Sequence, residues 1–447
     1  MKSLLIKNGI LVSSRGSLRS DVLIRDGRIA RVGEALQEGA DEVLNASGLH
    51  VLPGVLDPQV HFREPGLTWK EDLRTGSMAA AAGGVTSFFD MPNNNPAITT
   101  RALMEEKKAS AASKSVVNYN FFIGATPDNL EELNAVSNVC GIKIFMGSST
   151  GSLLVDREED LERIFAGGSR LIAVHAEDNG IIEENKRRIP NPSFRDHDKI
   201  RDEKAALKAT KLAVSLALKH KRRLHILHLT TQEEVEFLAA YKNNPLISCE
   251  VCPQHFLLFA PEIYERLGAL AQMNPPLREK RHGEALWKGL KEGVIRCMAT
   301  DHAPHTLEEK AQPYGKAPSG MPGVQTLLPL MLNQAAQGLC SVEDVVRWTS
   351  ENTLACFGVQ GKGRIEPGYD ADLTLVDLKA SREVKRDAML TRSGWSPYEG
   401  MTLQGWPLYT LVGGHVVYRE GVIDESVKGR EINLQPPWER PAGLGEL

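Results

Sequence analysis

The chain has 447 residues, of which 42% are hydrophobic and 25% charged, and its formal net charge at pH 7 is -4. These are the values of an ordinary soluble globular protein, and they give no reason to expect nucleic acid or an anionic membrane as a partner. No apolar run approaches the roughly 20 residues that span a bilayer, and the N-terminus lacks the apolar core of a signal peptide.

Both ends of the chain carry short apolar runs typical of β-strands. Residues 21–25 and 28–32 alternate apolar and polar side chains, and Asp26-Gly27 between them is a strong hairpin signal. Similar runs return at residues 372–377 and 411–418. We therefore expect one small β domain built from both termini, ending in a proline-bearing tail that is surface-docked or poorly ordered.

Between these ends, strand-like runs alternate with helical patterns. Strands are expected at residues 171–175, 224–228, 246–251 and 294–301, and helices from 203 to 220 and from about 232. This alternation indicates parallel strands with crossover helices, and the number of units favours an α/β fold, a closed (β/α)8 barrel. The predicted domains are 1–52 (first part of the β domain), 53–362 (barrel) and 363–447 (second part and tail).

Six cysteines are scattered through apolar segments, which favours buried, reduced thiols and a cytoplasmic location. Cys249 and Cys252 have the spacing of a metal-binding pair. No second pair accompanies them, so we expect no structural zinc there.

Ionisable residues stand at the ends of several predicted strands, namely His61, His175, His228 and Asp301. In a β/α barrel the C-terminal strand ends form the active-site face, so this placement indicates an enzyme. Singly, each histidine is more often a hydrogen-bonded core or surface residue. Together, imidazoles and a carboxylate suit Zn²⁺, and Asp301 could also act as a general base.

Two basic residues could serve such a site. Lys143 lies among apolar neighbours, and its simplest interpretation is a lysine that snorkels or pairs with a carboxylate. Alternatively its pKa is depressed, and the neutral amine reacts with CO₂ to form a carbamate that can bridge two metals. The guanidinium of Arg63 could bind a substrate carboxylate through two parallel hydrogen bonds; the alternative is that Arg63 forms a surface salt bridge.

Eight short motifs, in order along essentially the whole chain, resemble those of dihydroorotases in the amidohydrolase superfamily. They are His-Phe-Arg-Glu-Pro-Gly (61–66), Lys-Glu-Asp (70–72), Gly-Gly-Val-Thr (83–86), Met-Pro-Asn (91–93), His-Ala-Glu (175–177), Met-Asn-Pro-Pro-Leu-Arg (273–278), Asp-His-Ala-Pro-His (301–305) and Ser-Pro-Tyr-Glu-Gly (396–400). Several are weak alone, but their order over this length is highly specific.

The resemblance implies a zinc-bearing barrel that interconverts dihydroorotate and N-carbamoyl-L-aspartate in pyrimidine (UMP) biosynthesis, with one or two zinc ions. By position, it implies metal ligands at His61, His175, His228, Asp301 and Lys143, the last matching a lysine that is carboxylated in part of the family. Asp301 is also the implied catalytic base. The implied substrate-binding residues are Arg63, Asn93, Asn274, His305, Ser319 and Gly320.

The chain departs from the family pattern at Gln59, where the family usually has a histidine. An amide oxygen is a weak, neutral ligand for Zn²⁺, so we expect the metal position next to His61 to lose affinity. The position formed by Lys143, His175 and His228 should be less affected.

Three hypotheses result. The leading one is an active dihydroorotase, which the resemblance makes a cytoplasmic homodimer. The second is a non-catalytic dihydroorotase-like subunit that assembles with aspartate transcarbamoylase. This hypothesis is disfavoured because the chain retains Asp301, Arg63 and Asn93. The third is a related hydantoinase or allantoinase, although an anionic substrate explains Arg63 better than a neutral one does.

Overall fold

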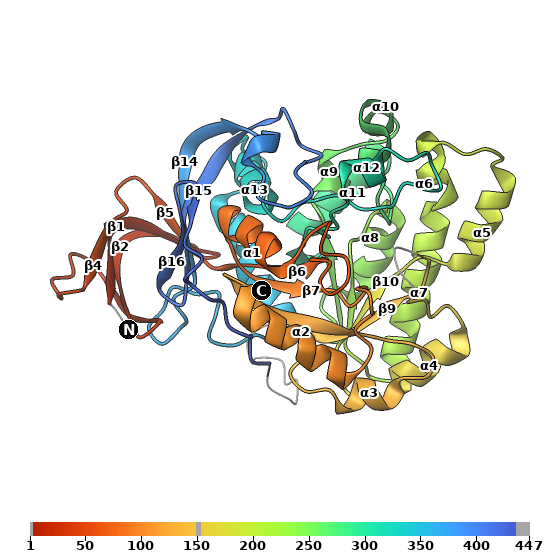
Figure 1. Ribbon diagram of the computed structural model, residues 1–447, viewed down its shortest axis with the longest axis horizontal. Helices are drawn as coiled ribbons and strands as arrows, with labels where there is room; N and C mark the ends of the chain where they lie inside the picture. Colours follow the sequence, from red (N-terminus) through yellow and green to blue (C-terminus); the bar gives the residue numbers. More distant parts are fainter. Residues whose placement is uncertain (1–2, 149–152, 435–447) are drawn as a thin grey trace.

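The computed structural model describes residues 3–148 and 153–434 (Figure 1). The proline-bearing tail predicted from the sequence lies outside these residues. Two sheets organise the described chain, one of nine strands and one of eight. None of the helices in the described ranges is long and apolar enough to cross a membrane.

The nine-stranded sheet joins the two ends of the chain, as predicted. Its strands follow the order β17-β16-β15-β14-β5-β1-β2-β3, and β4 pairs with β1. The predicted hairpin is confirmed, because Arg25 pairs with Arg28 around Asp26-Gly27. The bounds are β1 (Leu4–Ser13), β2 (Gly16–Arg25), β3 (Arg28–Gly33), β4 (Glu42–Asn45), β5 (His50–Pro53), β14 (Leu373–Glu383), β15 (Thr402–Val412), β16 (His415–Arg419) and β17 (Val422–Ile423).

The eight-stranded sheet is the predicted barrel. Its neighbouring strands are all parallel, from β6 to β13 in chain order. The two edges meet where Val60 bridges His302 and the His61 N–H donates to the His302 carbonyl at 2.7 Å. The bounds are β6 (Val55–Val60), β7 (Val85–Asp90), β8 (Asn118–Gly124), β9 (Gly141–Phe145), β10 (Ile172–His175), β11 (Leu224–Ile226), β12 (Ile247–Val251) and β13 (Cys297–Met298).

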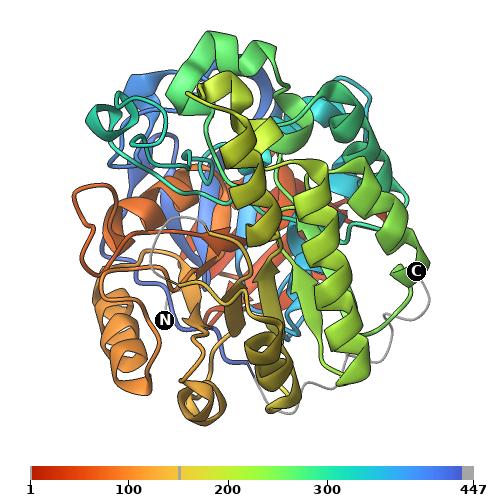
Figure 2. The same cartoon turned by 90° about the vertical axis from the view of Figure 1, so that its right-hand side faces the viewer.

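Helices surround the barrel strands, as Figure 2 shows from the side opposite the nine-stranded sheet. The predicted helix at 203–220 is α7, which begins after Asp202, whose side chain accepts from the Ala205 N–H. The α-helices are α1 (Leu73–Ala82), α2 (Arg101–Lys114), α3 (Leu130–Ala135), α4 (Glu158–Ala166), α5 (Asn179–Arg188), α6 (His197–Ile200), α7 (Glu203–Lys219), α8 (Gln232–Leu238), α9 (Gln254–Leu257), α10 (Glu262–Leu267), α11 (Lys280–Lys291), α12 (Leu307–Lys310), α13 (Leu327–Ala336), α14 (Val342–Val346) and α15 (Asn352–Cys356).

One predicted strand is much shorter than expected. The run at residues 294–301 forms a strand only at Cys297–Met298. Asp301 at its end has a φ of 49°, a left-handed conformation outside the range of a regular β-strand. The chain therefore leaves the ladder before it reaches the predicted ligand.

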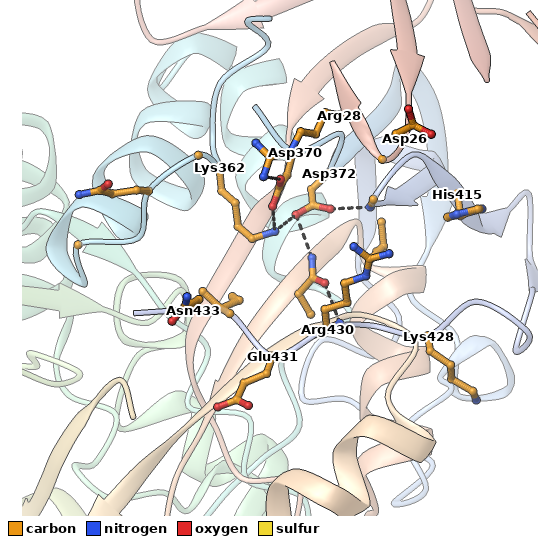
Figure 3. Close-up of a pocket in the computed structure, with 18 residues that line it drawn as sticks. Asp26, Arg28, Lys362, Asp370, Asp372, His415, Lys428, Arg430, Glu431 and Asn433 are labelled. Atoms are coloured by element: carbon orange, nitrogen blue, oxygen red, sulfur yellow. Dashed lines mark hydrogen bonds and ion pairs between the residues drawn. The ribbon is translucent and has the colours of Figure 1, made fainter. Parts of the chain in front are cut away.

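A buried carboxylate joins the nine-stranded sheet to the base of the barrel. Asp372 accepts from the Asn118 side-chain amide at 2.9 Å and the Gly413 N–H at 2.8 Å, and it pairs with Lys362 at 2.5 Å. These contacts line a cavity of about 640 Å³ between the two sheets (Figure 3). Within it Asp372 and Lys362 pair with each other.

Candidate active site

The predicted site residues converge on one cavity at the C-terminal ends of the barrel strands. His61 follows β6, Lys143 lies on β9, His175 ends β10, and His228 and Asp301 follow β11 and β13. The lining residues are Gln59, His61, Arg63, Asn93, Lys143, Phe145, His175, His228, Asn274, Asp301, Ala303, Ser319 and Gly320. Of the predicted residues, only His305 is absent from this wall.

His61 and Asp301 form one side of the cavity. The Asn93 side-chain oxygen lies 2.6 Å from His61 Nδ1, so that nitrogen donates and the ring is fixed in orientation. His61 Nε2 then faces the cavity, 2.9 Å from Asp301 Oδ1. Asn93 was predicted to contact substrate. Its position is also that of an oxygen acceptor behind a histidine, the usual support of a metal ligand.

His175 and His228 form the opposite side. His175 Nε2 donates to Glu177 at 2.7 Å, and its Nδ1 lies 3.2 Å from His228 Nε2. In the neutral ring that Nδ1 carries a lone pair, and it faces His228 Nε2. His228 Nδ1 is buried with no hydrogen-bond partner among the described residues. Burial lowers the pKa of both rings, which keeps them in the neutral form that binds metals.

Sequence reasoning missed the support behind His175. The Glu177 carboxylate accepts from Arg201 Nε at 3.1 and 3.0 Å. Although burial alone would raise the pKa of Glu177, Arg201 and His175 hold it well below its usual range. The spacing in His-Ala-Glu carried a signal, since residues two apart near a strand end face the same way. Nothing near Arg201 in the sequence indicated its part.

Lys143 is fully buried, and it neither reaches solvent nor forms an ion pair with a carboxylate in the described ranges. Its amine lies 4.4 Å from the centre of the Phe145 ring. Burial lowers the pKa of Lys143 to about 7, while Asp301 and Glu250 oppose the shift from a distance. A substantial share of the amine is therefore neutral near pH 7. The environment favours the second interpretation of this lysine over snorkelling or pairing.

Arg63 is also buried, with 1% of its surface exposed, so the surface salt bridge considered for it is absent. Its Nε donates to the Pro304 carbonyl at 3.1 Å, and its Nη2 lies 3.2 Å from His305 Nε2. Burial lowers the pKa of Arg63 to about 10, which leaves it charged at pH 7. In the described ranges no carboxylate forms an ion pair with it. His305 thus contacts Arg63 and does not line the cavity.

A backbone loop closes another wall of the cavity. The Lys310 ammonium donates to the carbonyls of Gln272, Pro318 and Gly320 at 3.0, 3.0 and 2.9 Å. Ser319 and Gly320 are thereby held against the site. Lys310 itself carried no signal in the sequence, because its three partners are backbone carbonyls, one at Gln272 and two in the loop at Pro318 and Gly320.

The fold and the site together define a class. A parallel (β/α)8 barrel with neutral imidazoles and a carboxylate at the C-terminal strand ends is the arrangement of a barrel hydrolase whose donors suit a metal. The chain belongs to the amidohydrolase family, whose family model matches residues 50–417.

Individual relatives narrow the class further. The chain is 37% identical to a dihydroorotase of Methanosarcina acetivorans over 95% of this chain and 94% of that protein. It is 35% identical to an allantoinase of Rubrobacter xylanophilus over 97% of this chain and 98% of that protein. The structure of the L-hydantoinase (dihydropyrimidinase) from Arthrobacter aurescens matches with a TM-score of 0.92 at 29% identity, covering 97% of this chain and 100% of that one. The predicted resemblance to dihydroorotases is confirmed, and the chain is a cyclic amide hydrolase.

Proposed function

We propose that the protein is a zinc-dependent dihydroorotase that interconverts dihydroorotate and N-carbamoyl-L-aspartate in pyrimidine biosynthesis. The observation that carries the proposal is Arg63, a buried cation that lines the cavity and has no ion-paired carboxylate in the described ranges. Four carboxylates offset its charge only from a distance, and a buried charge without a directly bonded partner is costly. A carboxylate on the substrate would compensate it, and dihydroorotate has one where hydantoin and allantoin have none.

The donor set supports a metal at this site. His61, His175, His228 and Asp301, with Lys143 once carboxylated, would hold one or two zinc ions. Two observations suit such an ion: His175 Nδ1 and His228 Nε2 face each other at 3.2 Å, and the pKa of Lys143 is depressed. When bound, zinc polarises the amide carbonyl and makes water more acidic.

The remaining chemistry falls to the side chains. We propose that Asp301 takes the proton of the attacking water and returns it to the ring nitrogen that leaves. The left-handed backbone at Asp301 turns its carboxylate into the cavity beside His61. Arg63 would hold the substrate carboxylate, with Asn274 and the Ser319–Gly320 backbone beside it, so that the scissile amide faces Asp301.

Gln59 modifies this site without removing it. Its amide nitrogen donates to Asp301 Oδ1 at 3.1 Å, and its Oε1 is buried without a partner in the described part of the chain. That oxygen could bind a metal ion beside His61, but as an uncharged ligand. We propose that it makes the adjacent metal position the weaker of the two.

The second candidate function is that of a hydantoinase, which the likeness to the Arthrobacter aurescens structure favours. A non-catalytic role is less well supported, because the complete ligand set converges on one cavity. A homodimer and an association with aspartate transcarbamoylase stay proposals drawn from the resemblance.

One set of assays separates these functions. Zinc-supplemented protein is given dihydroorotate, hydantoin and allantoin in parallel, with Asp301→Ala as the control. We expect turnover of dihydroorotate and its loss in the variant. Metal-loaded protein that fails to hydrolyse dihydroorotate would exclude the proposal, and activity that survives in Asp301→Ala would exclude the proposed base.

A further inference from the structure

A second cluster of reactive side chains lies at the opposite end of the barrel from the active site. The sulfurs of Cys297 and Cys356 and a ring nitrogen of His225 all lie within 4.8 Å of one another. Cys297 begins β13, His225 lies on β11, and Cys356 ends α15. Because β11 and β13 carry His228 and Asp301 beyond their other ends, this cluster is separate from the site already described.

The two cysteines differ in access. Cys297 is fully buried, whereas Cys356 is partly exposed. Cys356 lines a cavity of about 30 Å³, together with Ser248 and two arginines, Arg223 and Arg296. A cavity of this size holds one or two water-sized molecules. A small oxidant can thus reach Cys356 and cannot reach Cys297 directly.

The surroundings favour the thiolate of Cys356. The neighbouring Cys297 side chain, together with the nearby His225 and the positive charges of Arg296 and Arg223, lowers the pKa of Cys356 to about 6, although burial opposes this shift. Arg223 also donates to the Cys356 carbonyl at 2.6 Å. Burial raises the pKa of Cys297 well above its ordinary value. Access and charge therefore both favour Cys356 as the nucleophile, with the buried Cys297 thiol beside it.

A metal is the other ligand that two sulfurs and an imidazole could take. Both nitrogens of His225 are already used, at 2.8 Å from Ser248 Oγ and 2.9 Å from Glu250. The two arginines on the cavity wall also repel a cation. The same charges attract and stabilise a thiolate, so the arrangement suits thiol chemistry better than metal binding.

We propose that Cys356 and Cys297 form a peroxide-reactive thiol pair. The Cys356 thiolate attacks a peroxide oxygen, the O–O bond breaks, and the sulfur becomes a sulfenic acid while the other oxygen leaves as hydroxide and takes up a proton. The Cys297 thiol then attacks the Cys356 sulfur, the S–O bond breaks, and water leaves with the Cys297 proton. The product is a Cys297–Cys356 disulfide, and a thiol reductant restores both cysteines.

The test uses the metal-loaded, full-length protein and a small excess of hydrogen peroxide at pH 7. We expect the protein mass to fall by that of two hydrogen atoms, peptide mapping to place the disulfide at Cys297–Cys356, and dithiothreitol to reverse it. In Cys297→Ser we expect a sulfenic acid on Cys356 that dimedone traps. The rate should rise through about pH 6, as the thiolate of Cys356 forms.

Cys340 is the matched control, because it is also partly exposed but burial raises its pKa to about 12. We expect Cys356 to react at least about a hundredfold faster than Cys340, and Cys340→Ser to behave like the wild type. Equal rates at the two thiols would overturn the proposal. So would a disulfide at another pair, or a metal ion held by Cys297 and Cys356. The wild-type measurement alone decides, even if a variant folds poorly.

Discussion

Three residues that line the cavity have a left-handed backbone conformation, which residues other than glycine rarely adopt. The φ angles are 58° at Arg63, 36° at His228 and 49° at Asp301. Each such residue costs about 1 kcal/mol or more, and it persists only where its surroundings hold it. No pattern of residue types predicts these angles, because the surrounding barrel imposes them. The sequence indicated which residues matter here and left open how they are aimed.

Gln59→His tests the metal position next to His61. The new imidazole would replace a neutral amide oxygen, so we expect zinc to bind that position at least about tenfold more tightly. Competition with a chromophoric chelator measures the affinity, and two binding steps should become closer in strength. Unchanged affinity would mean that Gln59 does not set the strength of this position.

Lys143 gives the site a pH dependence with a definite sign. Its pKa of about 7 means that the amine becomes increasingly neutral above pH 7 and charged below it. Only the neutral amine reacts with CO₂. We therefore expect reconstitution of metal-free protein with zinc and ¹³C-bicarbonate to form a carbamate readily at pH 8 and poorly at pH 6. A carbamate signal that is equal at both pH values, or survives in Lys143→Ala, would contradict this assignment.

Among the elements, the parts that sequence patterns predicted best are those stabilised locally. Asp26-Gly27 predicted its hairpin because turn geometry alone selects those residues. The pattern for α7 was correct to one residue at its C-terminal end. The sequence did not predict the extent of β13, the contact of Arg201 with Glu177 or the contact of Lys310 with Gln272, because each depends on how separate segments pack together.

The loop at Ser319–Gly320 is the element whose position we expect to control catalysis. A Cβ on Gly320 would lie 2.4 Å from the Ala303 carbonyl oxygen, and its φ is 140°. Gly320→Ala must therefore displace the loop, and we expect kcat/KM to fall by at least about tenfold. Gly315→Ala is the control, since its φ of 86° is also positive but no atom lies within 4 Å of the added carbon. Similar losses in both variants would point to backbone strain in place of loop position.

At the scale of the whole molecule, the sequence predicted a barrel with a sheet made from both termini, and the structure has both. We propose residues 1–52 with 363–447, and residues 53–362, as the two domains. The joint between the sheets was not foreseen. Asp372 gave no sign of contacting Asn118 and Lys362 at once, because this contact exists only after both sheets have formed.

Asp372→Asn should lower the free energy of unfolding of the protein without changing its catalytic rate. The substitution leaves the nearly buried Lys362 with a weaker partner, and breaking a buried pair costs about 3 kcal/mol or more. Urea unfolding measures the loss, and kcat should be unchanged. Asp370→Asn is the control, because Asp370 also pairs with Lys362, at 2.9 Å, but is 31% exposed. Equal destabilisation by the two variants would contradict the role given to Asp372.

The central claim is that this hydrolase recognises its substrate by binding the substrate's carboxylate with Arg63. The most direct test compares kcat/KM for dihydroorotate with that for dihydrouracil, the same ring without the carboxylate, in the wild type and in Arg63→Gln. We expect the wild type to prefer dihydroorotate by at least about a hundredfold, roughly 3 kcal/mol, and the variant to lose most of that preference, chiefly through KM. A wild type that hydrolyses dihydrouracil as well as dihydroorotate, or a preference that survives in Arg63→Gln, would contradict the account.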